Sequence, residues 1–342
     1  MKRIYVITGA NGHLGYTIVK KLSSEEVEIR ALVLPNENPQ RLEEFECKIF
    51  FGNVCNREDL DPLFANSEDS QVVVIHCAGL ISIASRVSKL VYDVNVNGTK
   101  NMVDKAIEYK ANKLIYISSV HAIPELKKGE TIVEVDEFNP DLVKGEYAKT
   151  KAMATNYVLE KARKGLDAVV IHPAGIIGPY DYGRGHLTQL VLDYFNKKLT
   201  ALVNGGYDFV DVRDVAEGII QAIEKGKRGE CYILSNKYIS IRDLVKMIAP
   251  FSTRKPIKTI LPIWFAKLTA PLAELYYKIR KKPPLYTSYS LYTLLSNSNF
   301  SHEKATKELG YLPRDINDTV KDTIDWMKEK GRINNEKNEK AG

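Results

Sequence analysis

Three glycines near the N-terminus constrain the fold of this chain more than any other feature. Gly9, Gly12 and Gly15 follow a β-branched run at residues 3–8 (RIYVIT), and apolar residues at helical spacing follow over residues 14–22. In a strand, glycine turn and helix, the glycines allow a tight turn and let backbone approach a pyrophosphate at the helix N-terminus. The pattern predicts a dinucleotide-binding unit, and a purely structural glycine turn is the alternative.

The rest of the first 235 residues continues as an alternation of strands and helices. We expect further strands at residues 27–34, 48–51, 72–76, 114–117, 167–172 and 231–234. The unbroken apolar run VVVIH at 72–76 is typical of a parallel strand that is buried on both faces. The sequence therefore predicts an α/β fold with a doubly wound, Rossmann-type parallel sheet.

A change of character after residue 172 suggests a second domain. Pro173 ends the strand at 167–172, and Gly175, Gly178 and Pro179 follow in a loop that leaves the sheet. The remaining chain is richer in aromatic residues. We assign a nucleotide-binding Rossmann domain to 1–172 and 212–235, a smaller substrate domain to 173–211 and 236–330, and a flexible tail to 331–342.

The stretch GEYAKTKAMA at 145–154 is the predicted catalytic element. It begins a helical pattern, in which Tyr147 and Lys151 lie one turn apart on the same face. A neighbouring ammonium favours phenolate, so we expect Lys151 to lower the pKa of Tyr147 towards a useful acid–base range. Ser119, at the carboxyl end of the strand at 114–117, can hydrogen-bond a substrate oxygen. A surface tyrosine with a solvated lysine, and a serine pair that satisfies strand-end backbone, are the alternatives.

The carboxyl ends of the other strands supply the expected cofactor contacts. Asn53 follows a strand and could accept from the adenine amino group, while the small residues Ala78 and Gly79 leave room for a cofactor against the backbone. His76 is interpreted as a packed strand-end residue, and Asn95 as a buried brace or a solvated cap. The full set of expected cofactor residues is Gly9, Gly12, His13, Leu14, Gly15, Asn53, Val54, Ala78, Gly79, Tyr147, Lys151, Pro173 and Ile176.

The choice between NAD and NADP depends on the end of the second strand. Leu34 stands where an acid would bind the ribose hydroxyls or an arginine would bind a 2′-phosphate. Arg41 and His13 could supply positive charge, whereas Glu37 could repel a phosphate. We expect NAD(H) to be preferred to NADP(H).

Composition excludes several other classes of protein. The 49 Lys and Arg against 43 Asp and Glu give a formal charge of +6, and the basic run KIRKK at 278–282 lacks the base-stacking pattern of a nucleic-acid binder. The four cysteines are widely spaced, which suggests reduced thiols in a cytoplasmic protein and no metal site. We expect no signal peptide and no spanning helix. A small-molecule substrate is the expected partner, and a homodimer is possible.

The aromatic C-terminal part allows more than one interpretation. Residues 262–279 (PIWFAKLTAPLAELYYKI) are apolar but are interrupted by Lys267 and Pro271. We expect a pocket wall or packed core helix in preference to a membrane-surface helix. Tyr286, Tyr289 and Tyr292 fit either a pocket lining or ordinary core packing.

The sequence resembles the extended short-chain dehydrogenase/reductase family, also called the NAD-dependent epimerase/dehydratase family. The resemblance rests on TGANGHLG (8–15), NVNGT (95–99), ISS (117–119), YAKTK (147–151), HPAGIIGP (172–179) and FVDVRDVAEG (209–218). It implies a Rossmann domain that binds NAD(P), with Ser119, Tyr147 and Lys151 in the catalytic roles. Asn53 stands where an Asp is usual and His172 where Arg is frequent, and we expect these changes to affect cofactor affinity and not activity.

Three functions remain open on the sequence. The aromatic C-terminal part looks most like the dihydroflavonol-reductase and 3β-hydroxysteroid-dehydrogenase branch, which implies an oxidoreductase that interconverts a secondary alcohol and a ketone on a hydrophobic substrate. A sugar-nucleotide 4-epimerase with the same site is the second hypothesis. A redox-sensing regulator without catalysis is the third, and it is disfavoured because the Tyr147–Lys151 pair is intact. Ser119-Val120-His121 replaces the Thr-Asp-Glu of the dehydratase branch, so a dehydratase is not expected.

Overall fold

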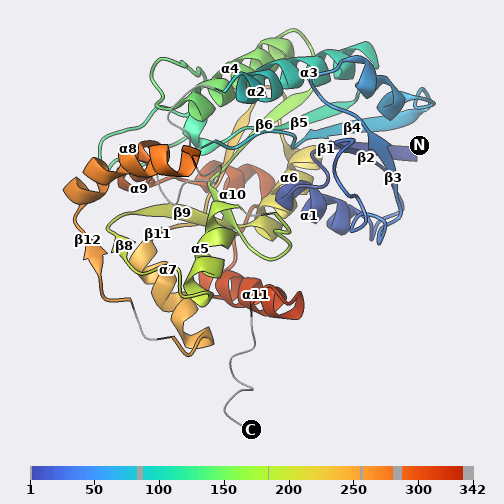
Figure 1. Ribbon diagram of the computed structural model, residues 1–342. Coiled ribbons are helices and arrows are strands. Elements are labelled where there is room, and N and C mark those ends of the chain that lie inside the picture. The colour runs from blue at the N-terminus through green and yellow to red at the C-terminus, as the bar shows by residue number, and fades with distance from the viewer. Residues whose placement is uncertain (1, 83–87, 184, 255–256, 280–286, 334–342) are drawn as a thin grey trace.

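A seven-stranded parallel sheet forms the centre of the molecule. The computed structural model describes residues 2–82, 88–183, 185–254, 257–279 and 287–333 (Figure 1). The strand order is β10-β6-β5-β4-β1-β2-β3, and each neighbouring pair is parallel. The strands are β1 (Lys2–Thr8), β2 (Glu28–Val33), β3 (Cys47–Phe51), β4 (Ser70–His76), β5 (Lys113–Ile117), β6 (Ala168–Pro173) and β10 (Cys231–Leu234). The predicted doubly wound Rossmann-type sheet is confirmed.

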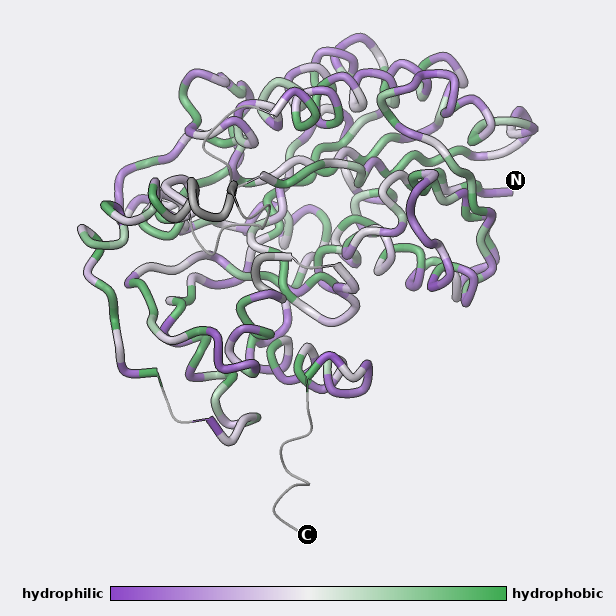
Figure 2. The backbone as a smooth tube through the Cα atoms, in the orientation of Figure 1, coloured by the Kyte–Doolittle hydropathy of each residue, from purple (hydrophilic) through white to green (hydrophobic). Residues whose placement is uncertain are grey.

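Helices cover both faces of this sheet, which explains the unbroken apolar runs in its strands. α2, α3 and α4 lie on one face, while α1 and α6 lie on the other (Figure 1). Figure 2 shows the apolar colour concentrated along the central strands. The helical segments of this part are α1 (His13–Leu22), η1 (Glu58–Phe64), α2 (Lys89–Tyr92), η2 (Asp93–Gly98), α3 (Thr99–Glu108), η3 (Val120–Ala122), α4 (Glu146–Arg163) and α6 (Val212–Lys225).

A second, smaller unit is built around its own core. Its strands β7 (Gly175–Ile177), β9 (Gly206–Asp211) and β11 (Lys237–Ser240) form a three-stranded sheet, and β8 (Leu202–Val203) pairs with β12 (Ile260–Leu261). Tyr194, Phe209, Leu244 and Ile324 are fully buried within this core. The helical segments are α5 (His186–Phe195), α7 (Ile241–Ile248), η4 (Ala249–Phe251), α8 (Ile263–Ile279), α9 (Ser288–Leu295) and α11 (Ile316–Glu329).

Two segments depart from the expected domain boundaries. α10 (Glu303–Leu309) was assigned to the substrate domain, but it packs against α6 and β10, and its Ala305 and Leu309 are buried in the first core. Residues 332 and 333 of the expected tail are packed on the protein, because Ile333 is only 5% exposed and Arg332 donates to the backbone carbonyl of Gly183. The rest of that tail lies outside the described residues. Long-range packing, which local composition does not reveal, decides both boundaries.

Candidate active site

The glycine loop leaves the N-terminus of α1 open for an anion. Gly12 is the N-cap, no side chain caps the helix, and no acidic residue lies in its first turn. A Cβ on Gly15 would lie 2.1 Å from the carbonyl oxygen of Gly9, so only glycine lets the helix approach the turn this closely. Unpaired amides and the helix dipole favour negative charge at such an end. The loop therefore fits a pyrophosphate.

The three expected catalytic residues meet at the carboxyl end of β5. Tyr147 and Lys151 are in the first two turns of α4, and their side chains are buried. The ammonium of Lys151 donates to the carbonyl oxygen of Ile117 at 2.8 Å, which anchors α4 to the end of β5. Ser119 follows two residues after the end of β5, and its hydroxyl accepts from the backbone N–H of His121 at 3.2 Å. The segment after β5 thus presents the hydroxyl, and α4 presents the phenol and the ammonium.

The pKa values correct the expected role of the lysine. Burial raises the pKa of Tyr147 to about 12, and a hydrogen bond with Ser119 acts in the opposite direction. Burial also lowers the pKa of Lys151 to about 8, against the raising effect of Cys77. Desolvation is the largest cause for both groups, so the pKa of Tyr147 is raised on balance and not lowered as predicted. Tyr147 is consequently a protonated phenol at neutral pH, which is the form that can donate a proton.

A buried asparagine joins the segment after β4 to α4. Asn95, in the π-helical turn η2, exchanges two hydrogen bonds with the backbone of Leu80 and donates to Thr150 of α4 at 3.1 Å. Asn95 is fully buried, so it is a brace and not a solvated cap. A Cβ on Gly79 would lie 3.2 Å from the Lys151 ammonium, which places this glycine beside the catalytic lysine.

His76 and Ala78 fasten the same edge to β1. His76 is fully buried between the hydroxyls of Thr8 and Thr99, at 2.7 and 3.1 Å, which confirms it as a packed strand-end residue. The N–H of Ala78 donates to Thr8 Oγ1 at 3.2 Å. Pro173 ends β6 as a buried residue, and Ile176 lies in β7 opposite Val210. Their contacts with a cofactor stay predictions.

His121 is a site residue that the sequence reasoning missed. Its Nε2 and the Tyr207 hydroxyl lie 2.6 Å apart and share a hydrogen bond. Its ring meets the Tyr147 ring edge to face, with centroids 6.1 Å apart. Burial lowers the pKa of His121 to about 4, so the imidazole is neutral at pH 7. The only sequence signal was a histidine two residues after Ser119, and Tyr207, on a strand of the other unit, gave none.

Tyr289 completes an aromatic wall beside these residues. A Cβ on Gly145, the N-cap of α4, would lie 2.2 Å from the Tyr289 ring, so the glycine lets α9 pack directly on this helix end. The His121 and Tyr289 ring centroids are 6.5 Å apart. Tyr289 and Tyr292 line a cavity of about 690 Å³. The predicted pocket role of these two residues therefore has support, whereas Tyr286 lies outside the described residues.

The chain also matches known proteins over most of its length. The model of the NAD dependent epimerase/dehydratase family matches residues 5–235. The chain belongs to this family. It is 26% identical to sterol demethylase protein B of Methylococcus capsulatus, over 96% of this chain and 99% of that protein. It is 30% identical to mouse 3 beta-hydroxysteroid dehydrogenase type 7, over 91% of each chain.

The fold is also that of solved family members. A UDP-glucose 4-epimerase from Thermotoga maritima superposes with a TM-score of 0.76 at 20% identity, over 96% of this chain and 99% of that one. The protein is thus an NAD(P)-dependent enzyme of the extended short-chain dehydrogenase/reductase type. The geometry of the glycine loop and of the Ser119, Tyr147 and Lys151 side chains fits a nicotinamide dinucleotide.

His172, which departs from the family pattern, contacts the backbone of a catalytic residue. His172 Nδ1 lies 2.9 Å from the carbonyl oxygen of Ser119, to which it donates, and its ring stacks on Phe138 with centroids 5.0 Å apart. Burial lowers the pKa of His172 to about 4, so the ring is neutral. We expected this position to affect cofactor affinity alone, but its contact holds the backbone of a catalytic residue.

The expected adenosine end of this family's cofactor site is a cavity of about 480 Å³ beyond β2. Arg41 reaches back to the glycine loop, where it donates to Asn11 Oδ1 at 2.8 Å and to the Asn11 carbonyl at 3.0 Å. The Asn11 amide in turn donates to Glu37 at 3.3 Å. A guanidinium and a carboxylate therefore converge on one asparagine, at the position where the family distinguishes NAD from NADP.

Three of the expected cofactor residues have side chains that are buried or already hydrogen-bonded. Val54 is 5% exposed and packs on Gly98, so it has only its backbone to offer a cofactor. The side-chain oxygen Oδ1 of Asn53 already accepts from the N–H of Cys55 at 2.9 Å. The contact of Asn53 with adenine stays a prediction. Leu14 is likewise buried in the core.

His13 does not supply the positive charge that we considered. Its Nε2 lies 2.8 Å from the Pro179 carbonyl oxygen, and burial lowers its pKa more than the charge of Asp181 raises it. The neutral ring instead ties the glycine loop to the chain that follows β7. No cluster of three metal-ligating side chains occurs among the residues that the structure describes.

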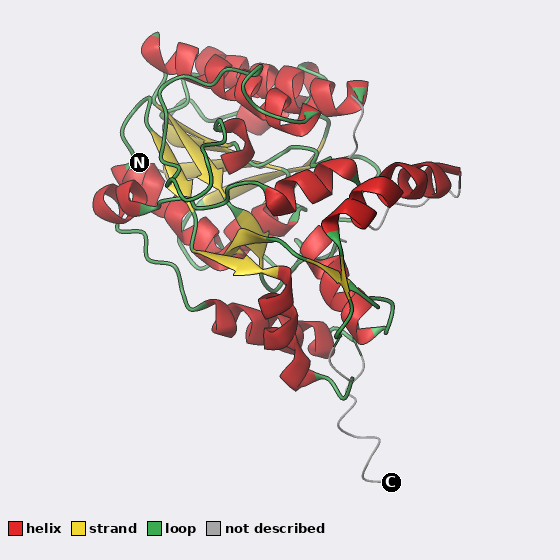
Figure 3. Ribbon diagram, turned by 90° about the vertical axis from the view of Figure 1, so that its left-hand side faces the viewer, coloured by secondary structure: helices red, strands yellow, loops and turns green. Residues whose placement is uncertain are grey.

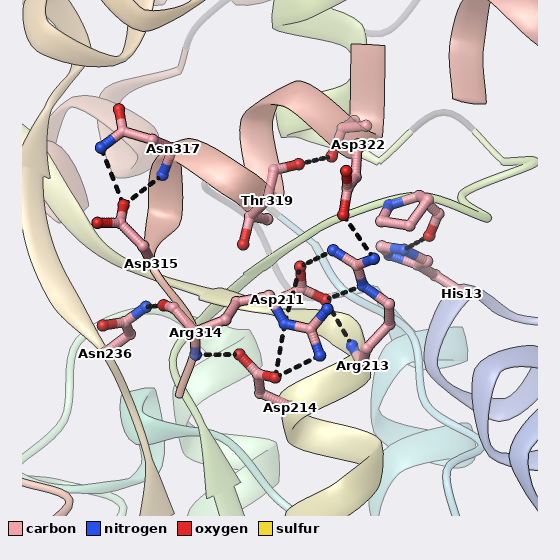
Figure 4. Close-up of polar contacts among 12 residues, drawn as sticks. His13, Asp211, Arg213, Asp214, Asn236, Arg314, Asp315, Asn317, Thr319 and Asp322 are labelled. Atoms are coloured by element: carbon pink, nitrogen blue, oxygen red, sulfur yellow. Dashed lines mark hydrogen bonds and ion pairs between the residues drawn. The ribbon is translucent and has the colours of Figure 1, made fainter. Parts of the chain in front are cut away.

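A partly buried ion-pair cluster joins α6 to the second unit (Figure 4). Arg213 donates to Asp211 at 2.7 Å and to Asp322 of α11 at 2.8 Å. Arg314 donates to Asp214 at 2.8 Å. Burial alone would raise the pKa of Asp211, but the hydrogen bonds and charge of Arg213 leave it lowered. Asp211 therefore remains ionised at neutral pH, and Arg213 links α6 to α11.

Proposed function

We propose that this enzyme interconverts a secondary alcohol and a ketone on a hydrophobic, ring-containing small molecule. The observation that carries the proposal is the wall of Tyr207, Tyr289 and neutral His121 directly beside Tyr147. Aromatic rings suit an apolar ring better than a nucleotide diphosphate, and the lysines Lys144, Lys149 and Lys267 line only the cavity on the far side of Tyr289 together with three acidic residues. The names of the two relatives, a sterol demethylase protein and a hydroxysteroid dehydrogenase, support the same class.

The residues divide the work of carbonyl reduction. Ser119 donates a hydrogen bond that orients the substrate oxygen, and Tyr147 gives its phenolic proton to that oxygen as the alcohol forms. A nicotinamide cofactor, when bound, would supply the hydride for the carbonyl carbon. Lys151, held by the Ile117 carbonyl, would contact the nicotinamide ribose and stabilise the phenolate that remains. In the direction of oxidation, the phenolate takes the proton back.

For the cofactor we propose NAD(H) with a modest preference. Glu37 faces the same asparagine as Arg41, and two of the Arg41 donor groups are already engaged by Asn11. His13 is neutral and contacts Pro179, so it contributes no charge for a 2′-phosphate. A missing charge-assisted hydrogen bond costs about 1.5–3 kcal/mol, so we expect NADH to bind about tenfold to a hundredfold more tightly than NADPH.

One experiment tests substrate class and cofactor together. The purified protein is titrated with NADH and NADPH by fluorescence, and is then assayed with hydrophobic ring ketones and with UDP-sugars. We expect reversible NADH binding and cofactor-dependent reduction of ring ketones. Cofactor that copurifies and is recycled while a UDP-sugar is epimerised would overturn the proposal in favour of the epimerase. Cofactor binding without turnover on either panel would indicate the regulator.

A further inference from the structure

The helix α8 exposes an apolar face that nothing in the described chain covers. Trp264, Phe265, Leu268 and Leu272 are 68%, 41%, 66% and 67% exposed. Their spacing places them on one arc of about 100°. The opposite side of the helix is packed, since Ala266 and Ala270 are fully buried with Leu291 of α9. We expected a helix buried in a core or a pocket wall, but only one side of α8 is buried.

This face has the shape for a lipid surface, and its described part is smaller than one side of a stable dimer interface. The four side chains expose on the order of 400–500 Å², estimated from the usual areas of such side chains. A stable dimer buries about 800 Å² on each partner. α8 also projects from the body of the molecule (Figure 3). A projecting convex helix offers no groove for a partner, whereas a bilayer needs none.

A single exposed lysine at the edge of the face suits an anionic surface. Lys267 is exposed at the edge of the apolar arc, and together with Lys144 and Lys149 it lines the cavity beside α9. The same cavity carries Glu125, Asp141 and Glu146. The three carboxylates balance the three ammonium groups inside the cavity, and Lys267 is the one of these cations that also borders the apolar arc. The basic run at 278–282 lies where side chains are not described.

We propose that α8 binds peripherally to an anionic lipid bilayer. Trp264, Leu268 and Leu272 enter the boundary between headgroups and acyl chains, and Lys267 contacts lipid phosphate. No helix among the described residues is long and apolar enough to cross a membrane, so α8 lies along the surface. α8 packs on α9, which carries Tyr289 beside Tyr147. If the proposed function holds, an apolar substrate dissolved in lipid therefore meets the protein close to the site.

The chain contains its own reporter for this contact. Of its two tryptophans, Trp264 is 68% exposed and Trp326 is 5% exposed. We would replace Trp326 by Phe and record the emission of Trp264 with vesicles of phosphatidylcholine alone or mixed with phosphatidylglycerol. A blue shift with the anionic vesicles, and quenching by brominated acyl chains, are expected. An emission that no vesicle changes would overturn the proposal.

A pair of variants separates insertion from non-specific adsorption. Leu268→Asp combined with Leu272→Asp should weaken vesicle cosedimentation by more than about tenfold. Leu312→Asp is the matched control, because Leu312 is 82% exposed in a loop far from α8 in the sequence, and it should bind like the unaltered chain. Equal binding by all three proteins would contradict the proposal.

Two further measurements distinguish the remaining outcomes. Sedimentation velocity without lipid shows whether the Leu268 and Leu272 changes dissociate a dimer; if they do, and vesicles are not bound, α8 is an interface between copies. Tyr147→Phe should bind vesicles like the unaltered protein, because α8 does not depend on catalysis. Failure of the proposed chemistry therefore leaves this test intact, and failure of vesicle binding leaves the chemistry intact.

Discussion

The carboxyl edge of the parallel sheet and the aromatic wall of His121, Tyr207 and Tyr289 are built in different ways. At the sheet edge, Lys151, Asn95 and His76 are each held by hydrogen bonds to backbone or to neighbouring hydroxyls. In the wall, the Tyr289 ring of α9 packs directly on Gly145. α8 packs on α9 and leaves its outer side exposed. Changes at the edge should therefore alter turnover, whereas changes in the wall should alter substrate selection.

The largest expected effect comes from the sheet edge. Tyr147→Phe removes the phenolic proton while it keeps the buried ring, so kcat should fall by about a hundredfold to ten-thousandfold. The dissociation constant for NADH should stay within about twofold, since the glycine loop is untouched. Steady-state kinetics and a fluorescence titration measure the two quantities. Unchanged turnover would show that Tyr147 is not the proton donor, and would contradict the assignment of turnover to the sheet edge.

The wall should respond in KM before it responds in kcat. His121→Phe keeps an aromatic ring beside Tyr147 but loses the hydrogen bond with Tyr207. We expect KM for a ring ketone to rise about tenfold, with NADH affinity unchanged. Tyr207→Phe is the matched variant, because it removes the same hydrogen bond from the other side and should give an effect in the same direction. A decrease in kcat with unchanged KM would show instead that His121 takes part in the chemical step.

The pH dependence tests which group titrates at the sheet edge. With its pKa raised to about 12, Tyr147 is protonated throughout the neutral range, so ketone reduction should be level from pH 6 to 8. Alcohol oxidation requires phenolate and should accelerate as pH rises, by up to about tenfold per unit. Lys151, with a pKa of about 8, loses its charge above that pH, and reduction should then decline.

Lys151→Arg is the control for that decline, because arginine stays charged. Initial rates are measured in both directions between pH 6 and 10. We expect the decline of ketone reduction above pH 8 to be absent in this variant. Reduction that accelerates with rising pH would contradict the assignment of Tyr147 as the proton donor.

The smallest expected effect lies at the adenosine end. Arg41→Ala should weaken NADPH binding by about threefold to tenfold more than NADH binding, because only a 2′-phosphate gains from the guanidinium. Glu37→Gln is the opposite variant, and it should improve NADPH binding by removing a negative charge. Fluorescence titration of both cofactors measures the ratio. An identical loss for NADH and NADPH would show that Arg41 acts only by holding Asn11.

The sequence by itself determined the sheet and most of the catalytic centre. Local rules are sufficient there: the strand, glycine turn and helix at residues 3–22 specify a phosphate loop, and the i, i+4 spacing places Tyr147 and Lys151 on one helical face. Carboxyl ends of parallel strands share an edge, which predicts that Ser119 meets this pair. Each of these inferences uses residues close in sequence or a property common to all such sheets.

Tertiary structure decided the environment of those residues. Burial raised the pKa of Tyr147, although the neighbouring ammonium alone would have lowered it, because desolvation depends on what packs above the helix. Tyr207 and Tyr289 reach His121 and Gly145 from segments 86 and 144 residues away in the sequence (207 − 121 and 289 − 145). The direction in which α8 turns its apolar face follows from its packing on α9. Such contacts join distant segments, and no local pattern encodes them.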